Sequence, residues 1–140
     1  MQNMTVDDII DGMVKITLNA QSLVDEAELL SKNKYHARAY TLAHIAREEI
    51  SKLYILFKVG IEVIAGKKYD YKKLQKRFNN HKSKIQFFSI PYYIDGLNGK
   101  YVEAINKRKN ESLYVGYEQS KFQSPSDSIS EHVANRTIEL

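Results

Sequence analysis

Apolar residues recur every three or four positions along most of the chain, a spacing that predicts amphipathic helices. The first predicted helix runs from Val6 to Ser31. Thr5 followed by Asp8 forms a capping-box pattern at its start, with the acid near the positive end of the helix dipole. The apolar positions of this helix form one stripe of Ile9, Met13, Ile16, Ala20, Leu23, Ala27 and Leu30.

A second helix is predicted to start between Asn33 and His36 and to end at Gly60 or Gly66. Gly66 is a suitable stop because lysines and an aspartate follow it. The apolar stripe of this helix consists of Ala39, Leu42, Ala46, Leu53 and either Leu56 or Phe57.

A third helix is predicted from Tyr71 to Ser89, ended by Pro91. A fourth helix covers Lys100 to Lys109, and the stretch from Glu111 to Glu118 is predicted to be extended. The stripe of the third helix consists of Leu74, Phe78, Ile85 and Phe88.

The last predicted helix opens after Pro125, with Ser128 and Glu131 as a second capping box. The chain ends soon afterwards at Leu140, which leaves open whether the natural protein continues. These elements predict an all-α fold, an antiparallel helical bundle of four main helices plus a short C-terminal helix. A length of 140 residues fits a single domain over the whole chain.

Composition narrows the classes of protein that remain. The chain has no cysteine, which excludes disulfides, thiolate chemistry and the common structural zinc sites and fits a cytoplasmic protein. Its most apolar stretch, from Leu53 to Ala65, is interrupted by Lys58 and Glu62 and is too short to span a bilayer. We therefore expect a cytoplasmic protein with no membrane association.

The net charge of +4 is unevenly distributed along the chain. Acidic residues dominate residues 1–31, whereas basic residues dominate residues 67–84. A basic face of this kind can bind RNA, another anion or an acidic protein, although a solvated lysine-rich face is the simpler interpretation. The candidate RNA- or anion-binding residues are Lys72, Lys73 and Lys76.

Two polar residues stand where the apolar period calls for a hydrophobic one. Glu49 interrupts the stripe of the second helix, and His81 interrupts the stripe of the third. Both side chains should therefore point into the seam between helices, where a carboxylate is rarely buried without a partner. We predict that Glu49 and His81 meet or share a polar pocket, either as a functional pair or as a structural salt bridge that fixes the helix register.

Helical spacing gives each of these residues polar neighbours. Arg77 and Lys84 are predicted to share one side of the third helix with His81. On the second helix, a neighbouring face carries His44, Glu48 and Lys52. Glu48 and Lys52 have the favourable orientation for an ion pair four residues apart, which we interpret as structural.

The chain offers no pattern for a metal or a nucleotide cofactor. It lacks the paired Glu-x-x-His motifs of di-iron bundles and the glycine-rich loops that bind phosphates. We therefore expect no cofactor and no metal. Metal-free RNA cleavage remains open, because it needs a base, an acid and cations for the phosphate, and histidine with arginine and lysine supplies these groups.

Three segments carry a resemblance to a known family. The first includes Asn19 and Ala20, and the second is the Ala-Arg-Glu-Glu-Ile-Ser-Lys sequence at residues 46–52. The third is Phe78 with the His-x-x-Lys at residues 81–84, and a weaker match follows at residues 113–115 and Pro125. In order and spacing these segments resemble the HEPN-type domain of the AbiV-like abortive infection family of bacterial anti-phage proteins.

This resemblance implies a helical bundle that forms a homodimer and defends bacteria against phage. Many HEPN domains are metal-independent ribonucleases with an Arg-(x4–6)-His motif, and the resemblance implies a site across the dimer. Here only three residues separate Arg77 from His81. Arg38 and His44 have a matching gap, but side chains six residues apart on a helix point to different sides.

Three functions therefore remain open. The first is a phage-defence protein that impairs RNA or translation, including as a metal-independent endoribonuclease. In that case His81 is the general base or acid, Arg77 and Lys84 hold the phosphate, and Glu49 orients His81. The supporting residues of the second helix are Glu48, Lys52 and His44.

The alternative is a non-enzymatic dimeric module that binds a phage-encoded or translation-related protein through its basic helix and tyrosine-rich surface. His81→Ala should abolish toxicity in the first case and leave it intact in the second. Passive RNA binding by the basic face is a third reading, recognisable by affinity that falls steeply with salt.

Overall fold

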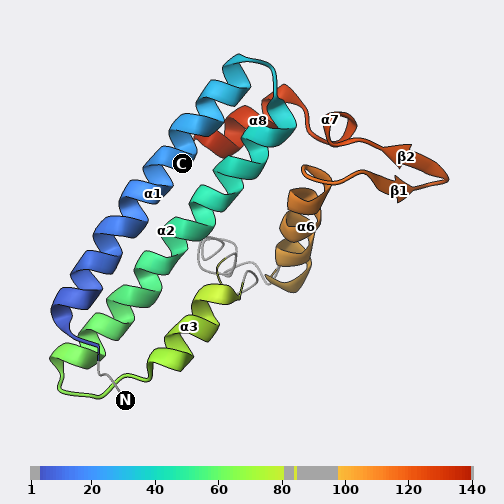
Figure 1. Cartoon of the computed structure of the whole chain (residues 1–140). Helices are drawn as coiled ribbons and strands as arrows, with labels where there is room; N and C mark the ends of the chain where they lie inside the picture. The colour runs from blue at the N-terminus through green and yellow to red at the C-terminus, as the bar shows by residue number, and fades with distance from the viewer. Residues whose placement is uncertain (1–3, 81–83, 85–97, 140) are drawn as a thin grey trace.

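The computed structural model describes residues 4–80, 84 and 98–139, and its frame is a pair of long antiparallel helices (Figure 1). The first helix, α1 (Val6–Lys32), starts at the predicted capping box, in which Thr5 and Asp8 hydrogen-bond each other's backbone N–H groups. The predicted stripe faces inward, with Ile9, Ile16 and Ala20 among its buried members.

The second helix, α2 (His36–Ile64), runs back along α1. Gly66 follows its end with a φ of 77°, a conformation that glycine adopts without strain, so the later of the two predicted stops is confirmed. Of the two candidates for the end of its stripe, Leu56 is buried, whereas Phe57 is 60% exposed.

The third helix is shorter than predicted. It ends as α3 (Tyr71–Asn79), because Asn80 adopts an extended conformation with φ −89° and ψ 100°. Asparagine is a poor helix-interior residue whose side chain competes for backbone hydrogen bonds. Lys84 is again helical, and its N–H donates to the carbonyl of Asn80. The prediction of one continuous helix from Tyr71 to Ser89 is therefore wrong at Asn80, and most of its second half lies outside the described residues.

The fourth predicted helix is confirmed as α6 (Asn98–Glu111). A buried hydrogen bond of 2.7 Å between the hydroxyls of Thr41 and Ser112 fixes the end of α6 against α2. The predicted extended stretch of residues 111–118 is a strand only at its end: Glu111 belongs to α6, residues 112–114 form a turn, and β1 covers Gly116–Glu118. This strand pairs antiparallel with an unpredicted strand, β2 (Lys121–Gln123). This hairpin projects from the bundle (Figure 1).

The C-terminal region contains two short helices, α7 (Pro125–Ser128) and α8 (Glu131–Ile138). The predicted capping box of Ser128 and Glu131 is wrong. Ser124 forms the box with Asp127, and Ser130 caps α8 by accepting from the N–H of Val133. The register differs because the chain turns at buried Ile129 between two separate helices.

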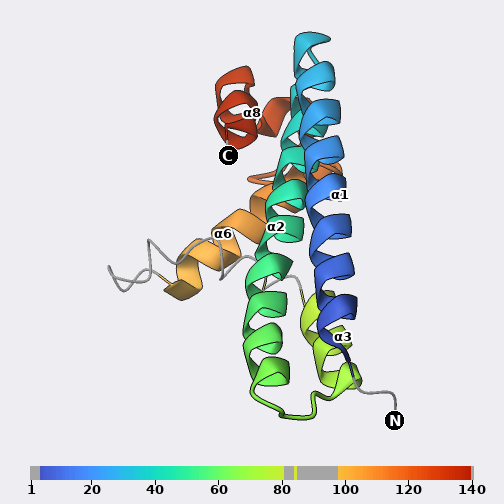
Figure 2. The same ribbon diagram turned by 90° about the vertical axis from the view of Figure 1, so that its left-hand side faces the viewer.

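These elements confirm the predicted all-α bundle. One apolar cluster joins α1, α2 and α3, and a second joins the start of α2 to Ile129 and α8. The two views agree that α8 lies against one end of the α1–α2 pair and α3 near the other (Figures 1 and 2). In the described part of the chain, every helix is too short or too polar to cross a membrane.

Candidate functional site

A buried carboxylate on α2 is the centre of the most concentrated group of charges in the described structure. Glu48 is only 3% exposed. Its Oε1 lies 3.1 Å from His44 Nε2 and 3.4 Å from Lys109 Nζ, and its Oε2 lies 3.3 Å from Lys84 Nζ. One carboxylate thus joins α2, the helical residue Lys84 and α6. We call these four residues the Glu48 cluster.

In this cluster Glu48 has one partner on its own helix and two partners that are distant in sequence. His44 and Glu48 are one helical turn apart, so they share a face of α2. Lys84 and Lys109 reach the same point from segments far along the chain. Burial of a carboxylate is costly unless it is paired and hydrogen-bonded, and here two ammonium groups and an imidazole nitrogen supply the partners.

Packing closes the Glu48 cluster against solvent. His44 is 2% exposed and stacks on the ring of Tyr40, with ring centroids 6.2 Å apart. Burial raises the pKa of the Tyr40 hydroxyl above its usual value, against the opposing effect of Arg108 and Arg47. The arrangement fastens three segments together and leaves little access for a polymer such as RNA.

The two adjacent glutamates of α2 pair with different lysines. Lys52 pairs with Glu49, three residues before it, and its ammonium lies 5.5 Å from the centre of the Phe78 ring. The predicted ion pair between Lys52 and Glu48 is wrong because Glu48 turns to the interior. The predicted meeting of Glu49 with His81 lies outside the described residues, since His81 is not among them.

The predicted grouping of Arg77, His81 and Lys84 on one helix face loses its geometric basis. The break at Asn80 separates Arg77 from Lys84. Lys84 is 5% exposed and paired with Glu48, so it does not present a cation to a phosphate at the surface. The prediction that Lys84 holds a phosphate is therefore not supported, because its charge is directed inward.

The lysines of α3, unlike Lys84, are exposed to solvent. Lys72, Lys73 and Lys76 are all exposed, while Leu74 between them is buried in the first apolar cluster. In the described structure none of these three lysines forms an ion pair. We call them the α3 lysines, and their charge is available to a partner.

The side chains of Arg38 and His44, the alternative Arg-(x4–6)-His match, point to different sides of α2, as their spacing predicts. Arg38 is exposed and donates to the carbonyl of Leu113 at 3.2 Å, whereas His44 is buried in the Glu48 cluster. The two residues therefore do not form one site.

Comparison with protein families finds one match that spans nearly all of the chain. The HEPN family model described as AbiV matches residues 8–140, nearly the whole chain. The chain belongs to the AbiV family. No curated protein and no solved structure gives a significant match. Membership in the AbiV family supports a role in abortive infection, the bacterial response that limits phage.

Within this AbiV protein, the sequence motif at residues 46–52 divides its polar residues between two environments. Glu48 enters the buried cluster, and Glu49 and Lys52 pair with each other nearer the surface. Arg47 donates to the carbonyls of Thr137 and Glu139 at the end of α8, at 3.0 and 3.2 Å. The motif therefore fastens distant parts of the bundle to α2.

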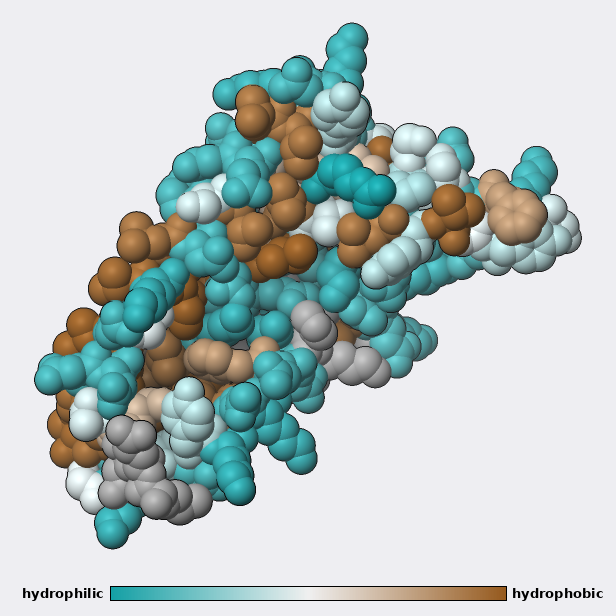
Figure 3. Space-filling model, viewed as in Figure 1, coloured by the Kyte–Doolittle hydropathy of each residue, from teal (hydrophilic) through white to brown (hydrophobic). Residues whose placement is uncertain are grey.

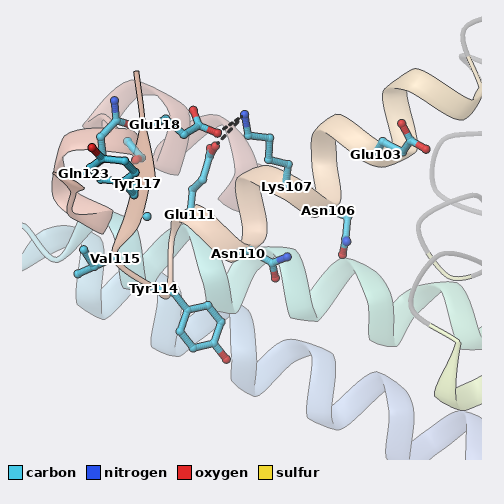
Figure 4. A pocket seen from close by; sticks show the side chains of 12 residues that line it. Glu103, Asn106, Lys107, Asn110, Glu111, Tyr114, Val115, Tyr117, Glu118 and Gln123 are labelled. Atoms are coloured by element: carbon cyan, nitrogen blue, oxygen red, sulfur yellow. Dashed lines mark ion pairs between the residues drawn. The ribbon is translucent and has the colours of Figure 1, made fainter. Parts of the chain in front are cut away.

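Sequence reasoning missed Lys109, because a lysine in a polar helix carries no pattern that marks it as buried. It also missed a hollow of about 420 Å³ between α6 and the β hairpin (Figure 4). There Lys107 pairs with Glu111 at 3.6 Å and with Glu118 at 2.6 Å, and hydrogen bonding to Glu118 raises the Lys107 pKa. Among the described residues, no three histidine or acidic side chains come together as metal ligands would.

Proposed function

We propose that this AbiV protein acts in abortive infection as a homodimeric binding module, without cutting RNA. The proposal rests on the different environments of two groups of lysines. Lys84 and Lys109 face inward and neutralise Glu48, while the α3 lysines face outward with no ion pair in the described structure.

Metal-free RNA cleavage requires a base, an acid and phosphate-binding cations together on one accessible surface. The described histidine–carboxylate pair, His44 with Glu48, is closed to solvent at 2% and 3% exposure. Lys84, the cation expected beside His81, is committed to a carboxylate. These features favour a structural role for the Glu48 cluster.

Binding needs only a complementary surface, and α3 supplies one. Its three exposed lysines lie beside Lys67 and Lys68, which are also exposed. Such a field attracts an acidic partner and speeds its encounter. We take the partner to be an acidic phage-encoded or translation-related protein met in the cytoplasm.

The experiment is a plating assay in bacteria that carry the gene, with the α3 lysines reversed together as Lys72→Glu, Lys73→Glu and Lys76→Glu. We expect phage protection to be lost, because a like-charge contact repels the partner. A matched variant makes the same charge change at exposed lysines elsewhere and should retain protection. Its substitutions are Lys34→Glu, Lys100→Glu and Lys121→Glu.

Both variants should be present in cells at the wild-type level and should melt at the wild-type temperature, since all six positions are exposed. Full protection by the α3 variant would contradict the proposal. Rapid loss of cellular RNA that purified protein reproduces in EDTA would instead support the endoribonuclease.

A further inference from the structure

The hollow of about 420 Å³ between α6 and the β hairpin is not used by the proposed function. One face of α6 forms one wall and strand β1 forms the other, and Lys107 reaches across from α6 to Glu118 (Figure 4). The hollow shares no residue with the α3 lysines. It is therefore a second candidate binding site, and its lining indicates the chemistry of its ligand.

Gly116, in the β1 wall, has neither a conformational nor a steric reason to be glycine. It lacks the positive φ of Gly66, and a Cβ built on it would meet no atom of the described structure within 4 Å. Glu118, two residues along β1, and Gln123, directly opposite Gly116 on β2, both line the hollow. A side chain at position 116 would therefore enter the hollow too. Glycine weakens a strand and often marks a place where a ligand approaches the backbone, so we interpret Gly116 in this way.

Carboxylates outnumber cations around the hollow. Its lining includes Glu103, Glu111 and Glu118, against Lys107 as its one basic residue. The Lys107 ammonium is shared, at 3.6 Å from Glu111 and 2.6 Å from Glu118. Glu103 forms no ion pair within the described part of the chain. Three carboxylates against one ammonium leave an excess of two negative charges, which attracts a cationic ligand.

The uncharged part of the lining favours a guanidinium over a simple ammonium. Three side-chain amides, each with a carbonyl oxygen that can accept a hydrogen bond, line the hollow: Asn106, Asn110 and Gln123. The rings of Tyr114 and Tyr117 also line it and are 66% and 64% exposed. Phe122 supports the Tyr117 ring, with ring centroids 4.9 Å apart. Arginine matches this lining because its flat group carries five N–H donors and stacks on aromatic rings.

We propose that this hollow binds an arginine side chain presented by a partner protein. The guanidinium donates to the carboxylates and amide oxygens of the lining, and a tyrosine ring covers its flat face. The surroundings of the hollow favour a protein as the source of the cation. Val115 in the lining and Phe122 beside it are 65% and 78% exposed, and hydrophobic atoms lie among hydrophilic ones on the projecting hairpin (Figure 3). Exposed aromatic and apolar side chains around an arginine pocket are typical of a protein interface.

The test is a titration of the full chain with N-acetyl-arginine amide, followed by NMR through the side-chain amide signals of asparagine and glutamine. We expect the signals of Asn106, Asn110 and Gln123 to shift with a Kd of about 1 mM, an affinity in keeping with so small a ligand. N-acetyl-citrulline amide has nearly the same shape without the charge. It should bind about tenfold more weakly or less tightly still, because it cannot form charge-assisted hydrogen bonds to the carboxylates.

Two variants test the hollow itself. Gly116→Val fills it from within β1 and should weaken binding of N-acetyl-arginine amide about tenfold or more, while valine suits a strand and should preserve the hairpin. Glu103→Gln with Glu111→Gln removes two negative charges and should also weaken binding about tenfold. The matched variant, Glu26→Gln with Glu139→Gln, makes the same charge change at exposed positions outside the hollow and should bind as the wild type does. Circular dichroism and melting temperature check that each variant folds.

Three results would overturn the inference. The first is wild-type affinity in Gly116→Val or in the variant that lacks the carboxylates of Glu103 and Glu111. The second is equal binding of the arginine and citrulline probes, which would show that charge does not select the ligand. The third is spermidine binding about tenfold more tightly than N-acetyl-arginine amide, which would identify a free polyamine as the ligand instead of a protein side chain.

Discussion

Replacement of Glu48 by glutamine should destabilise the protein far more than its conservative chemistry suggests. The amide keeps the shape of the side chain and removes its charge. Lys84 and Lys109 then face a neutral group at about 3.3–3.4 Å in a site that excludes water. The two ammonium groups already outnumber the single carboxylate, and Glu48→Gln removes the one negative charge that both of them share.

The distances set the magnitude of the effect. Two unit charges about 3.3 Å apart attract by ~5 kcal/mol at an effective dielectric constant of ~20. Removal of one partner from a buried pair costs about 3–5 kcal/mol after relaxation. The side chain of Lys109 is 13% exposed and can turn toward water, whereas that of Lys84 is 7% exposed. We therefore expect a loss near the lower end, about 3 kcal/mol.

The assay is urea unfolding at pH 7, followed by circular dichroism, for Glu48→Gln beside Glu49→Gln. The neighbouring residue has the same side chain on the same helix, and its partner Lys52 lies nearer the surface. Glu49→Gln should cost about 1 kcal/mol or less. The reasoning is refuted if the two variants lose equal stability, or if Glu48→Gln loses under 1 kcal/mol.

Three further predictions concern the frame around the cluster. Arg47→Ala should cost about 2 kcal/mol and speed amide hydrogen exchange in α8, because its guanidinium caps the carbonyls at the end of that helix. Gly66→Ala should lower the free energy of unfolding by about 1 kcal/mol because Gly66 has a positive φ. Gly60→Ala should raise it by about 0.5–1 kcal/mol, because alanine favours the helix and its Cβ fits beside Ile9. Opposite shifts in melting temperature check both predictions. Hydrogen bonds from Thr5 lower the pKa of Asp8, so this cap stabilises α1 above about pH 4 and is lost as the pH falls through the lowered value. Thr5→Ala should accordingly lower the melting temperature at pH 7 and have a smaller effect at pH 2.

Periodicity predicted the frame of the molecule because α1 and α2 bury one face over many turns. The inward positions of α1 recur regularly, and burial in the structure follows them from Ile9 to Ala27. Gly66 also ended α2 as expected, because its backbone conformation is one that only glycine adopts easily. These features depend on local chemistry, which a single sequence displays.

The site was less accessible to the same reasoning because it depends on contacts distant in sequence. The stripe pattern selected Glu49 as the inward acid, but Glu48 is the one that meets Lys84 and Lys109. Which of two adjacent glutamates becomes buried depends on where other segments pack against α2. One of those segments follows Asn80, where α3 ends. The β hairpin was partly missed since each of its strands has only three residues.

Phage protection by the His81→Ala protein tests the central claim most directly. In the RNA-cleaving hypothesis His81 is the general base or acid, whereas binding through the α3 lysines does not use it. The account predicts that cells carrying His81→Ala resist phage within about threefold of wild type, a difference under 1 kcal/mol. Complete loss of protection by a His81→Ala protein with wild-type abundance, mass and melting temperature would contradict it.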